Sequence, residues 1–103
     1  CILNEPTRLN DVMAAMVEAD IRGATVVESQ GMGKILSQDV PIFAGFRHLL
    51  AASKPYNYMI FSLVKGDEKI DDFISLIKDL LPQGGAYLFT LPVSRSIHLP
   101  TSR

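Results

Sequence analysis

The chain has 103 residues, 48% of them hydrophobic, which fits a single compact domain. Ten basic residues against 11 acidic ones give a formal net charge of −1, so there is no general electrostatic basis for binding nucleic acid or an anionic membrane. A lone cysteine, Cys1, excludes an internal disulfide, and no apolar run of about 18 residues offers a membrane span. We therefore expect one cytoplasmic domain over residues 1–99, without membrane insertion or a nucleic-acid partner, and a disordered tail at 100–103.

The N-terminal part of the chain predicts a strand, a helix and a second strand. Residues 1–4 form a short apolar run, and Thr7 is the expected cap of the helix that follows. The apolar stripe of that helix consists of Leu9, Val12, Met13, Met16 and Val17. Because residues 24–29 are rich in β-branched side chains, we expect a buried strand there, with Glu28 as the one acid in it.

The second strand runs into two glycines, Gly31 and Gly33. Without Cβ atoms the backbone at these positions can approach an anion closely, and Lys34 places a positive charge beside it. The segment therefore predicts a phosphate-binding corner.

A long excursion over residues 35–55 follows this corner. Within it, residues 41–52 have apolar side chains at helical spacing and predict a short amphipathic helix. Its apolar face either packs on this domain or a neighbouring subunit, which we favour, or docks on another protein. In the second case the partner-binding residues are Phe43, Phe46, Arg47 and Leu50.

The C-terminal half repeats the strand and helix pattern. Residues 56–64 predict a central strand, and Asp67 is the expected cap of a helix. The apolar positions of that helix are Ile70, Phe73, Ile74, Ile77, Leu80 and Leu81. Gly84 and Gly85 then form a second glycine corner, followed by a strand at 86–91 and a tail that can pair as an edge strand.

This order of elements predicts an α+β fold of the ferredoxin-like, split βαβ type. The arrangement βαββαβ gives one antiparallel sheet with both helices on one face. The strands are too apolar for the other face to meet water, so we expect identical subunits to cover it.

The residues G-A-T-V-V-E-S-Q-G-M-G-K at 23–34, the preceding helix D-V-M-A-A-M-V-E-A-D-I and the later F-T-L-P-V resemble the PII nitrogen-regulatory signalling proteins. The resemblance covers roughly residues 2–99 and is strongest from Leu9 to Gly33. It implies a non-catalytic, signal-transducing homotrimer of ferredoxin-like subunits. It also implies a nucleotide between subunits and a loop, here 35–55, that contacts a protein target.

Carried over by position, the resemblance assigns ligand-binding residues at both glycine corners. They are Thr25, Gly31, Met32, Gly33, Lys34, Gly84 and Gly85. His98 stands where the family has an arginine, and it is either a contact near the cleft or, as we favour, an exposed tail residue.

Several departures from the family pattern concern charge. Lys34 replaces an arginine, Ile35 replaces the glutamine used with magnesium and 2-oxoglutarate, and no lysine follows Gly85. Each missing cation removes a charge-assisted phosphate contact worth about 1.5–3 kcal/mol. We therefore expect AMP, ADP or another small anion rather than Mg-ATP, and no required cofactor.

Catalytic and metal-binding chemistry finds little support in the sequence. G-M-G-K is too short for a Walker loop, and the only histidines, His48 and His98, form no zinc-like spacing with Cys1. No nucleophile has an evident base, so we do not expect an enzyme, and we expect no metal site. The alternative function is a ferredoxin-like trimer of the metal-tolerance type.

Overall fold

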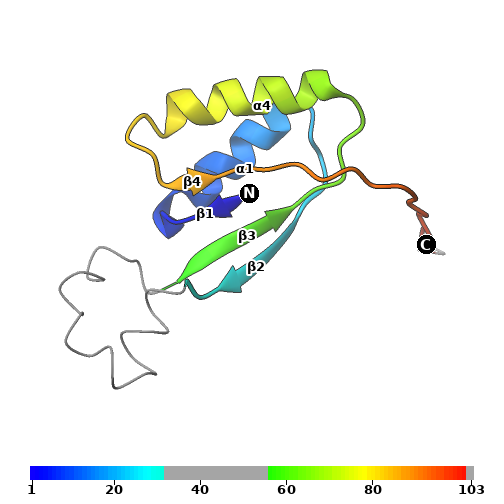
Figure 1. Cartoon of the computed structure of the whole chain (residues 1–103), viewed down its shortest axis with the longest axis horizontal. Coiled ribbons are helices and arrows are strands. Elements are labelled where there is room, and N and C mark those ends of the chain that lie inside the picture. The colour runs from blue at the N-terminus through cyan, green and yellow to red at the C-terminus, as the bar shows by residue number, and fades with distance from the viewer. Residues whose placement is uncertain (32–55, 102–103) are drawn as a thin grey trace.

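The computed structural model describes residues 1–31 and 56–101 of the chain (Figure 1). Short strands alternate with two longer helices along the sequence. The elements are β1 (Ile2–Leu3), the 3-10 helix η1 (Pro6–Arg8), α1 (Leu9–Glu18), β2 (Thr25–Ser29), β3 (Asn57–Phe61), α4 (Asp67–Leu80) and β4 (Ala86–Tyr87).

The four strands form one sheet in the order β2-β3-β1-β4, and each neighbouring pair is antiparallel. Leu3 in the central strand β1 is aligned with Tyr58 of β3 and with Ala86 of β4. The α+β class and the antiparallel sheet are therefore as predicted, and the arrangement is compatible with a ferredoxin-like fold. Strands β2 and β4 form the two edges of the sheet.

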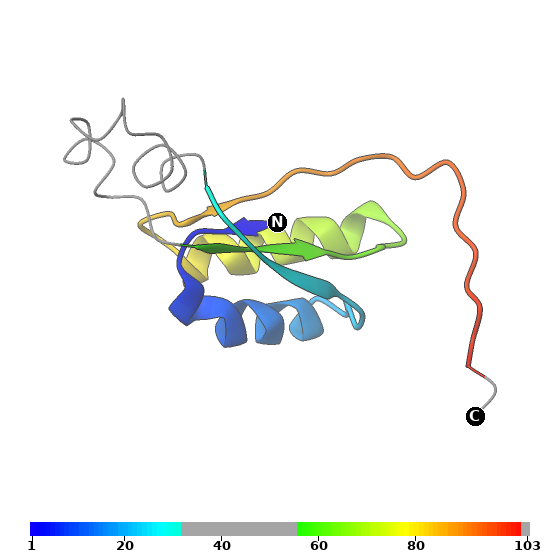
Figure 2. The same ribbon diagram turned by 90° about the horizontal axis from the view of Figure 1, so that it is seen from below.

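The core lies between the two helices and one face of the sheet. Leu3 and Ile60 project from that face, and both helices cover it (Figures 1 and 2). The helices contribute Val12, Ala15 and Met16 from α1 and Phe73 and Ile77 from α4. Leu3 and Val12 are completely buried, so the two-residue strand β1 and the first helix both contribute to the centre of this core.

The first helix differs from its prediction in two respects. Thr7 does not cap it, because Pro6 starts a 3-10 turn and α1 begins only at Leu9, after Arg8. Val17 is 65% exposed, since Ala15 and Ala19 occupy the buried side of the last turn instead. In the second helix the predicted cap was one residue too late, because Gly66 is the capping position and Asp67 lies in the first turn.

The strands are shorter and more exposed than predicted. β3 covers five residues and β4 only two, so most of the strand expected at 86–91 has no ladder partner among the described residues. The expectation of a buried β2 was wrong for the single chain, where Thr25 to Glu28 are all exposed. Glu28 is therefore a solvent-facing acid. The tail predicted as an edge strand is extended and runs away from the sheet (Figure 2).

Several predicted features lie outside the described residues. They are the amphipathic helix at 41–52 with Phe43, Phe46, Arg47 and Leu50, the corner residues Met32, Gly33 and Lys34, and the end of the tail at 102–103. Among residues 1–31 and 56–101, neither helix has the length and apolarity needed to cross a membrane.

Candidate functional site

The two glycine corners lie at the same end of the sheet, on opposite edges. Gly31 follows the end of β2, where Ser29 is aligned with Asn57. Gly84 and Gly85 precede β4, whose first residue is aligned with Leu3 at the end of β1. Because β1 runs antiparallel to both β3 and β4, the end of β1 coincides with the starts of β3 and β4.

A row of polar contacts links the two corners across this end of the sheet. The Ser29 hydroxyl donates to Oδ1 of Asn57, and Nδ2 of Asn57 donates to Oδ1 of Asn4 at 3.3 Å. The backbone N–H of Asn4 in turn donates to the carbonyl of Gly85 at 2.7 Å. The contacts therefore connect edge strand β2, through β3 and β1, to the corner before edge strand β4.

The second corner has a backbone that requires glycine. Gly84 and Gly85 have φ of 87° and 110°, values that side chains of L-residues rarely adopt. The N–H of Gly84 donates to the carbonyl of Leu81 at 3.0 Å, which fixes the corner to the end of α4. A Cβ at Gly84 would meet nothing within 4 Å, so the space beside this residue is open, whereas Glu5 occupies the corresponding space beside Gly85.

Thr25 lies at the other end of β2. It is aligned with Phe61, at the far end of β3 from Asn57. Six residues of extended chain separate Thr25 from Gly31, about 20 Å. Because side chains alternate along a strand, Thr25, Val27 and Ser29 share the face that the helices leave open. Only a ligand that lies along β2 would therefore contact both Thr25 and Gly31.

His98 is exposed in the C-terminal tail, in a stretch without regular structure. In the single chain it is not part of the row of polar contacts between the corners. The structure thus brings Gly31, Gly84 and Gly85 to one end of the sheet and leaves Thr25 and His98 away from it.

Sequence reasoning did not single out Asn4, Ser29 or Asn57. The contact between Asn57 and Asn4 joins residues 53 positions apart, which no local spacing reveals. A signal was nevertheless present, since Asn4 directly follows the apolar strand β1 and Asn57 is the first residue of β3. At such positions an amide side chain has both donors and an acceptor available to tie strand ends together.

The sheet face that the helices leave open is apolar. Val27, Met59, Ile2 and Tyr87 form one row across all four strands by register. Next to this row Phe61 is 55% exposed, and the Tyr87 and Phe89 rings lie 5.8 Å apart, both largely exposed. Apolar side chains from all four strands thus lie on this face, with Ile2 and Met59 half-buried and Val27, Phe61 and Tyr87 exposed. We call this surface the open face.

Metal binding finds no support in the described part of the chain. No three His, Cys, Asp or Glu side chains gather there in a way that could hold a metal ion. Comparison with known proteins gives no relatives: no family model, no curated protein and no solved structure matches this chain.

Proposed function

We propose that this chain is a PII-like regulatory protein. Its subunits would adopt the ferredoxin-like topology, assemble as a homotrimer and bind a small adenine nucleotide, AMP or ADP, between neighbouring subunits. The observation that carries the proposal is the placement of the two glycine corners at one end of the sheet and on its opposite edges.

This placement suits a ring of identical subunits. In a head-to-tail ring each interface joins two different surfaces, so the β2 edge of one subunit can meet the β4 edge of the next. Because both corners lie at the same end of the sheet, such a contact would bring Gly31 of one copy towards Gly84 and Gly85 of another. Clefts between subunits are favoured positions for ligands.

The open face supports assembly independently of the ligand. Its row of Ile2, Val27, Met59 and Tyr87 spans the whole sheet, and burying such a surface yields about 25 cal/mol per Å² of apolar area. Three copies packed around a shared axis would cover these faces with one another. The resemblance of residues 9–33 to the PII proteins favours three copies over two.

The charge of the described residues near the corners favours a ligand with few negative charges. Arg8 lies near this end but already donates to the Leu80 carbonyl at 3.2 Å and pairs with Asp11 at 3.1 Å. Two of the three guanidinium nitrogens thus already contact other groups of the protein. AMP and ADP have fewer phosphate groups than ATP, so they need fewer cationic partners and suit such a site better.

Signalling would proceed through the segment 35–55, which directly follows the first corner in sequence. A nucleotide that binds better to one arrangement of this segment than to another shifts the population towards it. The affinity of a protein target that contacts Phe43, Phe46, Arg47 or Leu50 would then depend on whether the cleft holds a nucleotide.

Calorimetric titration of the full chain with AMP, ADP, ATP and 2-oxoglutarate, each with and without magnesium, tests the proposal. We expect saturable binding of AMP or ADP and none of 2-oxoglutarate. A Cβ at Gly31 would lie 3.7 Å from Nδ2 of Asn57, an ordinary contact, so Gly31→Ala and Gly31→Leu should fold. Nucleotide affinity should fall as the side chain grows. Absence of nucleotide binding to the folded chain would refute the proposed function.

A further inference from the structure

A hollow lies at the end of the sheet opposite the glycine corners. It is a cavity of about 550 Å³ between the end of α1, the chain beyond β3 and the start of α4. This volume falls within the range of about 300–1,000 Å³ that is usual for small-molecule sites. Its lining consists of Asp20, Ile21, Arg22, Leu63, Val64, Lys65 and Lys69.

Three of the lining residues are cations and one is an acid. Arg22, Lys65 and Lys69 against Asp20 leave an excess of two positive charges, although the whole chain has a net charge of −1. Positive charge therefore outweighs negative charge among the residues that line the hollow, while Asp67 and Glu68 lie beside it in the first turn of α4. A concave, cation-lined surface raises the local concentration of small anions.

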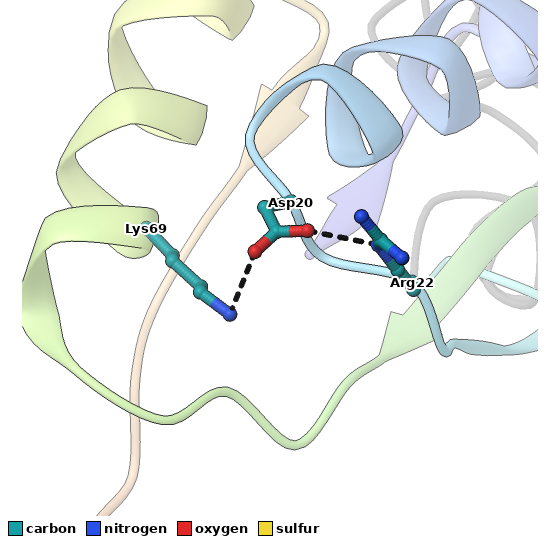
Figure 3. A network of polar contacts seen from close by, with 3 residues as sticks. All are labelled: Asp20, Arg22 and Lys69. Atoms are coloured by element: carbon teal, nitrogen blue, oxygen red, sulfur yellow. Dashed lines mark hydrogen bonds and ion pairs between the residues drawn. The ribbon is translucent and has the colours of Figure 1, made fainter.

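Asp20 holds two of these cations in position. It bonds Nε of Arg22 at 2.8 Å through one carboxylate oxygen and Nζ of Lys69 at 3.2 Å through the other (Figure 3). Its own backbone is fixed in the left-handed region, with φ of 63°, where the chain leaves α1. Because Arg22 uses Nε for this contact, its two terminal amino groups remain as donors.

Lys65 completes the positive side of the cavity. It forms no ion pair with any residue of the described ranges, whereas Lys69 is bound to Asp20. Next to Lys65, Leu63 is 59% exposed and provides an apolar wall together with Val64 and Ile21. One site thus combines two cations that are paired with Asp20, a third cation outside those ion pairs and an exposed apolar side chain.

We propose that this cavity binds a small organic phosphate monoester. The phosphate would lie against Arg22, Lys65 and Lys69, whose surplus of two charges after Asp20 matches a phosphate dianion. The organic group would cover Leu63. This site is distinct from the proposed nucleotide cleft, since it lies at the other end of β3, and the two can be tested separately.

The test is a titration of the isotope-labelled full chain followed by amide chemical shifts. The probes are inorganic phosphate and glycerol 3-phosphate, with glycerol as the uncharged control. We expect saturable shifts at Ile21, Arg22, Val64 and Lys65 with both phosphates and none with glycerol, and tighter binding of glycerol 3-phosphate. Shifts that do not saturate, or equal affinity for the two phosphates, would overturn the proposal.

Two charge variants distinguish a site from general electrostatic attraction. Lys65→Gln removes a cation that lines the cavity without breaking an ion pair of the described residues, and should weaken glycerol 3-phosphate binding about three- to tenfold. Lys78→Gln removes the same charge from the last turn of α4, away from the cavity, and should leave the affinity unchanged. Equal losses in the two variants would show that no specific site exists.

Discussion

Gly85 packs directly against Glu5, so that a Cβ added to the glycine would lie only 2.7 Å from Cγ of the glutamate. The glycine also has φ of 110°, and its carbonyl accepts the bond from Asn4. We therefore expect Gly85→Ala to lower the free energy of unfolding by about 1–3 kcal/mol, through backbone strain and displacement of Glu5. Denaturant unfolding measures this loss.

A matched control for this variant is Gly23→Ala. A Cβ at Gly23 meets nothing within 4 Å, and its φ lies outside the left-handed region. Its stability should be unchanged or raised by up to about 1 kcal/mol, because the unfolded chain loses freedom. If both variants were equally stable, the conformation assigned to the second corner would be wrong.

The bonds of Asp20 to Lys69 and Arg22 predict a dependence of stability on pH. These partners, Lys69 first, lower the pKa of the Asp20 carboxyl below its ordinary value of 3.8. A lowered pKa in the folded state means that the stabilisation is complete above the ordinary value and is lost as the pH falls below it. Asp20→Asn should therefore be less stable than the unmodified chain near neutral pH, and the difference should shrink on acidification.

Denaturant unfolding at a series of pH values measures this difference. Asparagine tolerates the left-handed backbone, so Asp20→Asn removes the charge without adding strain. The control is Asp72→Asn, because Asp72 is an exposed acid on α4 and belongs to no ion pair of the described ranges. Its stability should differ less from that of the unmodified chain. If the difference in stability between Asp20→Asn and the unmodified chain did not vary with pH, the role assigned to the ion pairs would be wrong.

The open face predicts that one charge placed on it prevents assembly. Phe61 is 55% exposed in the single chain, so Phe61→Glu should leave the subunit folded but place a carboxylate in the surface that other copies cover. Light scattering should then show single chains. Val17→Glu is the matched control, since Val17 is 65% exposed on α1, and it should assemble normally.

The sequence predicted the helices better than the strands. Apolar residues at helical spacing placed α1 and α4, and the glycines at 84 and 85 marked a corner whose positive φ values do require glycine. The strand at 24–29 was expected to be buried because it is β-branched. Its register places Val27 on the open face, where burial depends on partners outside the chain.

The polar row and the charged cavity were harder to predict for a different reason. Asn57 meets Asn4, and Lys69 meets Asp20, only after the sheet and helices have brought distant segments together. Asp20 itself was not singled out from the sequence. Its left-handed backbone, which aims the carboxylate at two cations, is a consequence of how α1 ends.

A ligand site shared between neighbouring subunits is tested most directly by complementation. Gly31→Leu blocks the corner on the β2 edge, and Gly84→Asn blocks the corner on the β4 edge, with asparagine chosen because it tolerates the φ of 87°. Each variant alone should lose nucleotide binding. An assembly containing both at equal amounts has an intact pair of corners at about a quarter of its interfaces, if the subunits mix randomly in a ring.

The decisive measurement is therefore the ADP stoichiometry of the co-expressed assembly, determined by calorimetry beside the two single variants. We predict that binding returns at about one site for every four chains, with the affinity of the unmodified protein. Mixed assemblies that bind no more ADP than either variant alone would contradict a site between subunits.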